Sequence, residues 1–353
     1  MRVVIVGGGV MGCSIAYHLE LAGASVVLLE RGEIGGESSG AAAGMLIAPI
    51  EDTADDAFNE LRRASLAIYP ELIGRVQDAS GIDVEYKVTG MLRTAVKPET
   101  AAWLKQVAHE QDGLSWLDHN EVREMEPALS EDVVGAAYSE DDADLNPGIW
   151  TKALAKAAES LGAEVRTGVT VGELTDRGVT TDQGAVEGDA IIVAAGAWTG
   201  GLTTIETPPK RGQMIAFRSQ ALRHTVWGED GYLVPKPGGF LWAGATVEDA
   251  GFDKQATEGG VDGLRSMAAG YVPGLEGADV ARAWAGLRPG SADGMPVIGR
   301  LKGQENVCVA TGHFRNGILL APITGALVAE LVLEGRLDDR LAPFSPERFN
   351  QET

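Results

Sequence analysis

Residues 1–30 read MRVVIVGGGVMGCSIAYHLELAGASVVLLE, and this stretch decides the fold of the first domain. The apolar run over 1–6 predicts a strand, and a glycine-rich turn follows it. Residues 10–22 predict a helix that leads to a second apolar run over 25–29, which ends at Glu30. This strand–helix–strand order, with an acidic residue at its end, predicts a dinucleotide-binding unit.

The glycines of the first turn are spaced for three separate purposes. Gly7 permits a tight turn, Gly9 lets the backbone approach a pyrophosphate, and Gly12 lets the helix pack closely on the strands. The free N–H groups of a helix N-terminus bind phosphate, so the phosphates are predicted at Val10 and Met11.

Glu30 lies at the carboxyl end of the second predicted strand, where it is expected to accept hydrogen bonds from the two ribose hydroxyls of an adenosine. A phosphorylated ribose would be repelled there. Glycine-rich turns also occur without a nucleotide, but here strand, helix, second strand and acidic residue follow in the required order. The motif therefore predicts nucleotide binding and leaves the choice between NAD and FAD open.

The composition is that of a globular protein. The chain has 353 residues, of which 44% are hydrophobic, enough for two domains or one large domain with a substantial core. No apolar run in the sequence reaches the length that crosses a bilayer, and the first apolar segment is the nucleotide strand rather than a signal peptide. A cytoplasmic protein is expected. The two cysteines, Cys13 and Cys308, are too few for a disulfide framework or a metal site, so no metal is expected.

The formal net charge of −22 at pH 7 repels polyanions, so nucleic acid and anionic membranes are not expected as partners. The same field opposes the approach of an anionic substrate such as a carboxylate. A local cluster of arginines in a water-poor pocket has to outweigh it, because charge interactions strengthen where water is excluded. The expected partner is a small molecule, and a homo-oligomer is left open.

A run of small residues over 35–45 follows the nucleotide unit. Small side chains let backbone amides crowd a flat or charged ligand, whereas a flexible linker would not lead directly into an apolar stretch. The run is therefore predicted to contact a cofactor. A strand over 189–194 also ends among small residues, around Ala195, Gly196 and Trp198, and is predicted to approach the adenosine half of that cofactor.

Periodicity and turn residues predict the remaining elements. Helices are expected over 52–80, 98–111, 147–161, 260–269 and 321–333. Strands are expected over 84–88, 90–94, 163–168, 213–217, 231–235, 240–246, 279–287 and 306–310, with a hairpin over 178–195 that turns at 182–184.

Four segments carry a resemblance that covers nearly the whole chain. They are Gly7-Gly8-Gly9-Val10-Met11-Gly12, Ser38-Ser39-Gly40-Ala41-Ala42-Ala43-Gly44-Met45-Leu46, Ala283-Trp284-Ala285-Gly286-Leu287-Arg288-Pro289-Gly290 and Gly312-His313-Phe314-Arg315-Asn316-Gly317-Ile318-Leu319-Leu320-Ala321-Pro322. The sequence resembles the D-amino-acid oxidase and glycine oxidase family of FAD-dependent oxidoreductases, and within it the glycine oxidases. The resemblance implies an α/β plus α+β fold, with an FAD-binding Rossmann-like domain of the glutathione-reductase type and an antiparallel-sheet substrate domain.

The FAD domain is expected to be discontinuous, because the nucleotide segments and the C-terminal block must meet on one cofactor. The expected divisions are 1–50, 141–210 and 285–353 for the FAD domain, and 51–140 and 211–284 for the substrate domain. The helices near 52–112 are expected beside the antiparallel sheet, and the ligand between the domains.

In the family, the arginine of the Gly-Leu-Arg-Pro segment forms a bidentate pair with the substrate carboxylate, and Arg288 matches it. Tyr232 matches the tyrosine that gives the carboxylate a hydroxyl hydrogen bond, and Arg315 matches a second active-site arginine. These three are the expected catalytic residues. The alternative for each is structural, as a surface ion pair or a core tyrosine.

The motifs and the resemblance together give the expected FAD-binding residues. They are Gly7, Gly9, Val10, Met11, Gly12, Glu30, Arg31, Ser38, Ser39, Ala42, Ala43, Gly44, Met45, Val169, Ala195, Gly196, Trp198, His313, Arg315, Asn316, Gly317, Ile318 and Leu319. The helix expected from 321 would direct its positive end at the reduced flavin, and His313 is expected beside the ring in a structural or electrostatic role. Covalent sarcosine oxidases have a cysteine in the segment that matches 285–290; this chain has none, so noncovalent FAD is expected.

The implied reaction is oxidative deamination of glycine or a related small amino acid by hydride transfer to flavin N5, with oxygen as electron acceptor. Its products are a 2-oxo acid such as glyoxylate, ammonia or an amine, and hydrogen peroxide. No general base is expected. The resemblance also implies a role in thiamine thiazole synthesis. Val247 stands where glycine oxidases have a methionine and Asp230 where they have a histidine, which changes the volume and polarity of the pocket.

Other functions share parts of this pattern. An oxidase of sarcosine or another N-substituted glycine has the same fold, as do D-amino-acid oxidases and dehydrogenases that pass electrons to a quinone or a protein. A nucleotide-binding regulatory protein would lack the carboxylate-binding arginine, and Arg288 is present.

Overall fold

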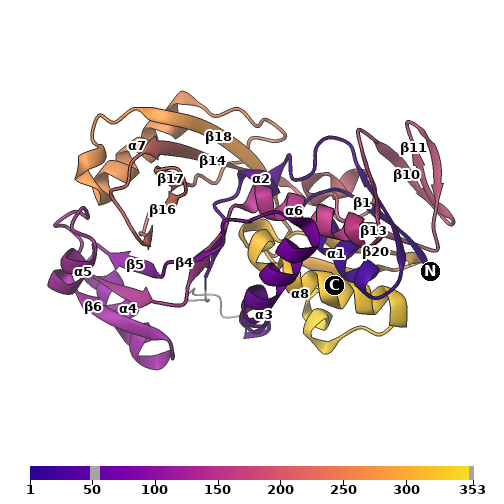
Figure 1. The fold of residues 1–353 in the computed structure, drawn as a ribbon, viewed down its shortest axis with the longest axis horizontal. Helices are drawn as coiled ribbons and strands as arrows, with labels where there is room; N and C mark the ends of the chain where they lie inside the picture. Colours follow the sequence, from indigo (N-terminus) through magenta and orange to yellow (C-terminus); the bar gives the residue numbers. More distant parts are fainter. Residues whose placement is uncertain (48–55, 350–353) are drawn as a thin grey trace.

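The computed structural model describes residues 1–47 and 56–349 (Figure 1). Two large sheets lie at opposite ends of its long axis, with the predicted α/β portion at one end and the strand-rich portion at the other. The expected combination of a Rossmann-like sheet and an antiparallel sheet is confirmed.

A six-stranded sheet forms the first end, in the order β19-β20-β13-β1-β2-β9. Its strands are β1 (Arg2–Val6), β2 (Ser25–Glu30), β9 (Glu164–Thr167), β13 (Ala190–Val193), β19 (Val297–Leu301) and β20 (Gln304–Thr311). Neighbours are parallel except β19 and β20. Helix α1 (Val10–Leu21) connects β1 to β2, so the predicted strand–helix–strand unit is confirmed.

Both faces of this sheet are covered, as parallel sheets require. Val3 and Ile5 of β1 face a core shared with α1, α3 (Asp56–Ser80), α6 (Pro147–Leu161) and α8 (Gly317–Glu334). Val4 and Val6 alternate to the other face. There they pack with residues of a small sheet of β10 (Val171–Thr175), β11 (Gly178–Thr181) and β12 (Gly184–Glu187).

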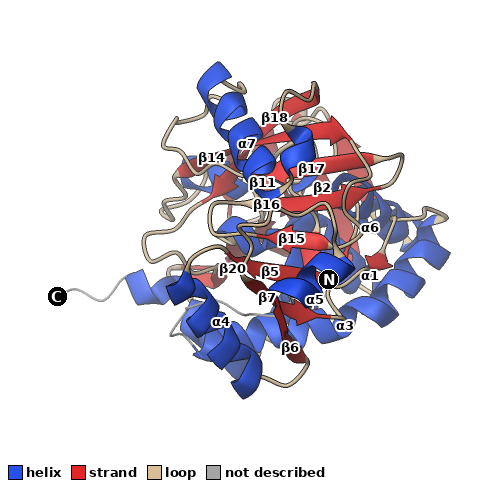
Figure 2. Ribbon diagram, turned by 90° about the vertical axis from the view of Figure 1, so that its left-hand side faces the viewer, coloured by secondary structure: helices blue, strands red, loops and turns tan. Residues whose placement is uncertain are grey.

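An eight-stranded sheet forms the second end, in the order β18-β14-β17-β16-β15-β5-β7-β6 (Figure 2). Its strands are β5 (Met91–Ala95), β6 (Leu114–Asp118), β7 (Gly135–Ser139), β14 (Pro209–Arg218), β15 (Thr225–Trp227), β16 (Tyr232–Lys236), β17 (Phe240–Gly244) and β18 (Val280–Pro289). All neighbours are antiparallel except β15 and β5, which join two separate stretches of chain. Helices α4 (Pro98–Glu110), α5 (His119–Met125) and α7 (Glu258–Tyr271) pack against it.

A small sheet of β3 (Met45–Leu46), β8 (Ala143–Asp144) and β4 (Lys87–Val88) lies where the chain crosses between the two ends. The Nζ atom of Lys236, on β16, lies 2.5 Å from Oδ1 of Asp144 and donates to the Leu145 carbonyl at 3.0 Å. Both charged side chains are buried. This ion pair fixes the eight-stranded sheet to the crossing point.

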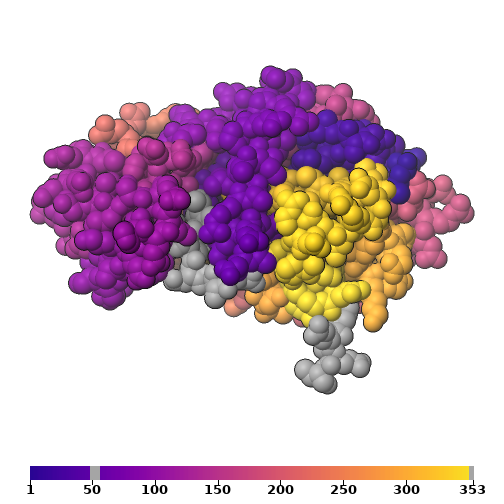
Figure 3. All heavy atoms as spheres, turned by 90° about the horizontal axis from the view of Figure 1, so that it is seen from below, coloured from indigo at the N-terminus to yellow at the C-terminus, as the bar shows by residue number. Residues whose placement is uncertain are grey.

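Helix α3 lies elsewhere than expected. It packs against α6 and α8 rather than beside the eight-stranded sheet, and the view from below shows it next to the C-terminal segment (Figure 3). Phe58, Leu61 and Leu72 give it an apolar stripe that matches the apolar surface of α8. The predicted start at 52 lies outside the described residues.

The start of the last helix was also predicted wrongly. Helix α8 begins at Gly317 and contains Pro322, which cannot donate to the carbonyl of Ile318. The hydroxyl of Tyr69 donates to that carbonyl, and the hydroxyl of Ser65 donates to the next one, Leu319, at 2.6 Å. Side chains of α3 therefore satisfy the backbone that proline leaves unpaired, and the helix continues through it.

Most other elements are confirmed within a few residues, and α6 agrees with its predicted bounds. The segment over 84–88 has only the two residues of β4 in a strand. The predicted hairpin over 178–195 turns as expected between β11 and β12, but its last part, β13, belongs to the six-stranded sheet. Within the described chain, one helical segment, Phe314–Glu334, is long and apolar enough to cross a membrane, and 72% of its most apolar window is buried inside the fold.

Candidate active site

A cavity of about 1010 Å³ extends from the six-stranded sheet to the eight-stranded sheet. Of the residues expected to bind cofactor or substrate, all but Gly12 line it. A Cβ atom at Gly12 would lie 1.9 Å from the carbonyl oxygen of Gly7, so this glycine permits close packing, as its position in the motif predicts. A cavity of this size is at the upper end of the roughly 300–1,000 Å³ of small-molecule pockets, which suits a large ligand.

The N-terminus of α1 opens onto the cavity at the glycine turn. Gly9 caps the helix without a side chain, and the first turn contains no acidic residue. Gly7 has φ of 112°, and a Cβ atom there would lie 2.4 Å from the Ala194 carbonyl. Ser39 accepts a hydrogen bond from the Val10 N–H at 3.0 Å, which draws the small-residue segment over this helix start. The arrangement leaves a positive helix end and open backbone facing the cavity, where they could bind an anion.

Glu30 lines the cavity and is already held by backbone. Its carboxylate accepts the N–H of Gly8 and the N–H of Gly32, each at 2.7 Å. The guanidinium of Arg31 lies 3.9 Å from the Trp198 ring centroid, so this cation and indole form one wall of the same end of the cavity.

The loop before α8 also lines the cavity. Phe314 has φ of 46°, in the left-handed region that disfavours a bulky side chain. Asn316 caps α8 without a side-chain hydrogen bond, and the first turn of the helix contains no acidic residue. A second positive helix end therefore faces the cavity, at Gly317 rather than at the predicted position near 321.

His313 is buried at the base of this loop. Its Nε2 lies 3.2 Å from the Thr324 hydroxyl, and its Nδ1 has no partner among the described residues. Burial lowers the pKa of His313 to about 3, so the ring is neutral at physiological pH. This agrees with the expected structural role and makes the ring a poor proton acceptor.

Arg288 and Tyr232 converge on the cavity from β18 and β16. Nη1 of Arg288 donates to the Thr246 carbonyl at 2.9 Å, and its side chain passes over Gly212, where a Cβ atom would lie 2.2 Å from that nitrogen. Burial lowers the pKa of Arg288, and the charge of Arg315 lowers it further. Burial raises the pKa of Tyr232, which the two arginines oppose.

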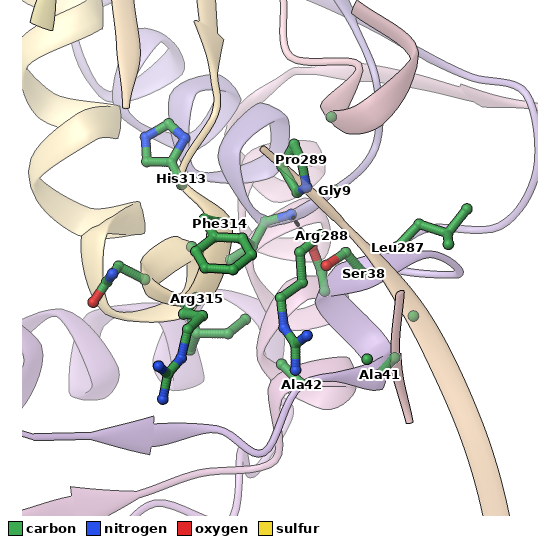
Figure 4. Close-up of a pocket in the computed structure, with 18 of the residues that line it drawn as sticks. Gly9, Ser38, Ala41, Ala42, Leu287, Arg288, Pro289, His313, Phe314 and Arg315 are labelled. Carbon is green, nitrogen blue, oxygen red and sulfur yellow. Dashed lines mark hydrogen bonds between the residues drawn. The ribbon is translucent and has the colours of Figure 1, made fainter. Parts of the chain in front are cut away.

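Figure 4 shows the side chains of Arg288 and Arg315 on either side of the Phe314 ring. The Arg288 guanidinium carbon lies 6.0 Å from that ring centroid, and the Arg315 guanidinium carbon lies 5.3 Å from the centroid of Trp227. The three residues expected to act on substrate are therefore brought to one end of the cavity.

A polar network lies behind Arg288. The hydroxyl of Thr246 donates to the carboxylate of Glu248 and accepts the Gln213 N–H at 2.9 Å. Arg211 donates to the same carboxylate from Nη2 at 2.6 Å, and the Gln213 side chain donates to it at 2.8 Å. The network fixes the carbonyl that receives Arg288.

Sequence reasoning missed several residues at this end. Arg93, Trp103 and Trp227 line the cavity, as do Thr100 and Glu229. They lie on β5, on α4 and at the end of β15, segments outside the four that carry the resemblance. Arg93 of β5 and Trp227 of β15 are brought together by the pairing of these two strands, which no local pattern in the sequence indicates.

The cavity fits FAD. Two helix N-termini that carry no acidic residue in their first turns face the cavity. They suit a ligand with a pyrophosphate and a ring that becomes anionic. The glycine turn leaves room for phosphate, and Glu30 is placed for ribose. The unpartnered Nδ1 of His313 is a buried polar atom in the cavity lining near α8. Neither cysteine lines the cavity.

A family model described as FAD dependent oxidoreductase matches residues 2–331. The chain belongs to this family. Among members of known function, the glycine oxidase of Bacillus licheniformis is 35% identical over 341 residues, which cover 94% of this chain and 92% of the relative. The bifunctional protein ThiO/ThiG of Trichormus variabilis is 34% identical over 99% of this chain, which spans 55% of that relative.

The fold of this FAD dependent oxidoreductase is also similar to solved structures. The crystal structure of glycine oxidase from Geobacillus kaustophilus has a TM-score of 0.92 and 34% sequence identity, over 98% of both chains. The predicted family, fold and cofactor are thus confirmed.

Proposed function

We propose that this FAD dependent oxidoreductase oxidises glycine or a related small amino acid with oxygen as electron acceptor. The substrate loses two electrons and two protons at its Cα–N bond and becomes an imine. Water converts the imine to a 2-oxo acid, glyoxylate from glycine, and ammonia, while oxygen becomes hydrogen peroxide. The relatives named glycine oxidase support the substrate, and the observation that carries the proposal is the pairing of Arg288 with Tyr232 inside the cavity.

Arg288 binds the substrate carboxylate in this proposal. Its planar guanidinium suits two parallel hydrogen bonds to a carboxylate, and Tyr232 adds a hydroxyl donor. Neither Arg288 nor Arg315 forms an ion pair with a carboxylate in the part of the chain that the structure describes. Both positive charges therefore remain available to an anionic substrate.

The arginines also favour the reactive form of the substrate. Two nearby positive charges lower the pKa of an ammonium group, so the substrate amine loses its proton more readily. Because the buried His313 is neutral and weakly basic, this effect replaces a strong side-chain base. FAD, when bound, supplies the acceptor for the two electrons and returns them to oxygen. The positive end of α8 stabilises negative charge next to it.

A secondary-amine substrate is the second candidate. Val247 lines the cavity and 56% of its surface is exposed. The chain therefore has a short side chain at the open rim of the cavity, at the position where glycine oxidases have a methionine. An N-alkyl substituent finds space there. Sarcosine would give glyoxylate and methylamine by the same chemistry.

The relation to a ThiO/ThiG protein supports a place in thiamine thiazole synthesis, in which the imine is the useful product. Restoration of thiamine-independent growth in a strain that lacks glycine oxidase would test this role. A cytoplasmic location and the absence of nucleic-acid and membrane partners stay predictions, and the oligomeric state stays open.

The test of the proposed function is anaerobic titration of the purified flavoprotein with glycine, sarcosine and a panel of D-amino acids. Loss of the visible flavin band with glycine or sarcosine, and peroxide on admitting air, is the expected result. A band that none of them bleaches contradicts the proposal. Bleaching without peroxide assigns the alternative of a dehydrogenase.

A further inference from the structure

We propose that residues 249–256 form a clasp that closes the end of the cavity expected to hold adenosine, and that this clasp slows the release of FAD. The segment follows β17 and precedes α7, so it belongs to the part of the chain that builds the eight-stranded sheet. Two of its side chains cross to the other part of the molecule. Phe252 contacts Trp198, and Lys254 contacts Glu37.

The two residues that the clasp contacts belong to one wall of the cavity. Trp198 and Glu37 line the cavity at the end that Glu30 also lines. Arg31 joins them, because its guanidinium carbon lies 3.9 Å from the Trp198 ring centroid and its Nη2 lies 3.1 Å from Oε1 of Glu37. The clasp therefore acts on a connected group of side chains at the end where adenosine is expected.

Phe252 covers this wall from outside. Its ring centroid lies 5.3 Å from that of Trp198, with an angle of 35° between the rings. Phe252 is 54% exposed and is not among the described residues that line the cavity. An aromatic pair of this kind stabilises its members beyond the area that it buries. Phe252 therefore opposes outward movement of Trp198 and of the Arg31 side chain that lies against it.

Lys254 adds an electrostatic contact. Its ammonium lies 2.8 Å from Oε2 of Glu37, while the other oxygen of this carboxylate faces Arg31. Two residues after Glu37, the Ser39 hydroxyl accepts the Val10 N–H at the start of α1, where the diphosphate of FAD is expected. A bare carboxylate near that place would repel the diphosphate. A cation at each oxygen of Glu37 offsets this repulsion.

The clasp has a fixed base on β14. Just before it, the backbone groups of Glu248 and Arg211 exchange two hydrogen bonds of 2.9 Å. Within it, the Asp253 carboxylate accepts Nη1 of Arg211 at 2.9 Å. Just after it, the Thr257 N–H donates to the Gln213 side chain at 2.7 Å. The contacts of the clasp with the cavity wall therefore tie the eight-stranded sheet to the adenosine end.

The test measures how fast FAD leaves the holoenzyme. The holoenzyme is diluted, and free and bound flavin are separated at timed intervals by rapid gel filtration. The double variant Phe252→Ala/Lys254→Gln is expected to release FAD about tenfold faster than the parent, because it removes one aromatic contact and one ion pair. The thermal midpoint of the apoprotein is expected to stay unchanged, since both side chains lie at the surface.

Phe349→Ala/Lys302→Gln is the matched control. It makes the same two changes at exposed residues, and neither belongs to the lining of the cavity in the described part of the chain. Its rate of FAD release is expected to equal that of the parent.

Salt separates the two contacts of the clasp. Lys254→Gln alone is expected to speed FAD release about threefold at low ionic strength, and this difference is expected to disappear at about 0.5 M salt, where exposed charges are screened. The effect of Phe252→Ala alone is expected to persist at both salt concentrations, because burial of apolar surface does not depend on charge. An effect of Lys254→Gln that salt leaves unchanged contradicts the electrostatic role given to Lys254.

A release rate within about twofold of the parent in the double variant overturns the clasp. Acceleration of equal size in the control variant overturns it as well, and so does a lowered thermal midpoint of the apoprotein, because faster release would then reflect general destabilisation. The measurements need bound FAD and no substrate. Failure of the proposed glycine oxidation would therefore leave this test intact.

Discussion

Replacement of Arg288 by methionine is predicted to change substrate binding and protein stability in opposite directions. The side chain is similar in length, so Arg288→Met removes the charge without opening a large cavity. Loss of one partner from a buried, hydrogen-bonded charge pair costs about 2–5 kcal/mol of binding energy. At about 1.4 kcal/mol per factor of ten, the KM for glycine is expected to rise roughly 30- to 4,000-fold, with FAD still bound.

The stability effect follows from the surroundings of Arg288 in the ligand-free protein. Burial lowers the pKa of Arg288, so the folded state disfavours its charged form. The interaction with Tyr232 offsets this in part, and Nη1 of Arg288 also donates to the Thr246 carbonyl. Replacing such a group with an apolar one is expected to leave the free energy of unfolding unchanged or to raise it by about 1 kcal/mol.

Two assays check these effects on the same preparation. Steady-state peroxide production at varied glycine concentration gives the binding effect as KM, and urea unfolding followed by circular dichroism gives the stability effect. A KM for glycine that remains within threefold of the parent refutes the clamp. A loss of more than 1 kcal/mol in unfolding free energy refutes the argument that Arg288 is retained for binding at a cost in stability.

Three further predictions follow from the same region. Glu248→Gln removes the charge that holds Arg211 and the Thr246 hydroxyl, so the Thr246 carbonyl that accepts the Arg288 hydrogen bond shifts. We expect a KM for glycine about tenfold higher and an FAD dissociation constant within twofold of the parent. An equal loss of FAD affinity would instead indicate general disruption. His313 has a folded pKa of about 3, below its usual value near 6.5, so the unfolded chain takes up a proton first as pH falls. The stability that the neutral ring contributes is present above about pH 6.5 and is lost at up to about 1.4 kcal/mol per pH unit as the pH falls toward 3. His313→Asn is expected to make the free energy of unfolding fall less steeply with pH, as measured by chemical unfolding at pH 7, 6, 5 and 4. An unchanged pH dependence in this variant would contradict the prediction. Val247→Met narrows the open rim and is expected to lower kcat/KM for N-ethylglycine severalfold more than for glycine, whereas parallel losses for both substrates would place Val247 away from the nitrogen substituent.

Local patterns were sufficient for the nucleotide-binding unit. The glycine turn and Glu30 lie within one strand–helix–strand unit in the first 30 residues, and the two strands of that unit pair with each other. The small-residue segments line the cavity because they follow parallel strands, and the carboxyl ends of parallel strands meet at one edge of a sheet.

Long-range pairing accounts for what the sequence did not indicate. Trp227 and Arg93 meet because β15 pairs with β5, although more than a hundred residues separate them. The start of α8 was missed because the hydroxyl of Tyr69, about 250 residues earlier, satisfies the carbonyl that Pro322 leaves unpaired. Neither contact follows from periodicity or turn chemistry.

The strand order of the six-stranded sheet determines when the molecule can fold during synthesis. β20 pairs with β13, and α8 covers α1 and α3, so the nascent chain exposes the edge of β13 and a large apolar surface until residues 304–334 emerge. An open strand edge beside exposed apolar helices promotes aggregation. Chains that stop before residue 304 are therefore expected to be substrates for chaperones and proteases, and retention of the cofactor is expected only after β20 and α8 have been synthesised.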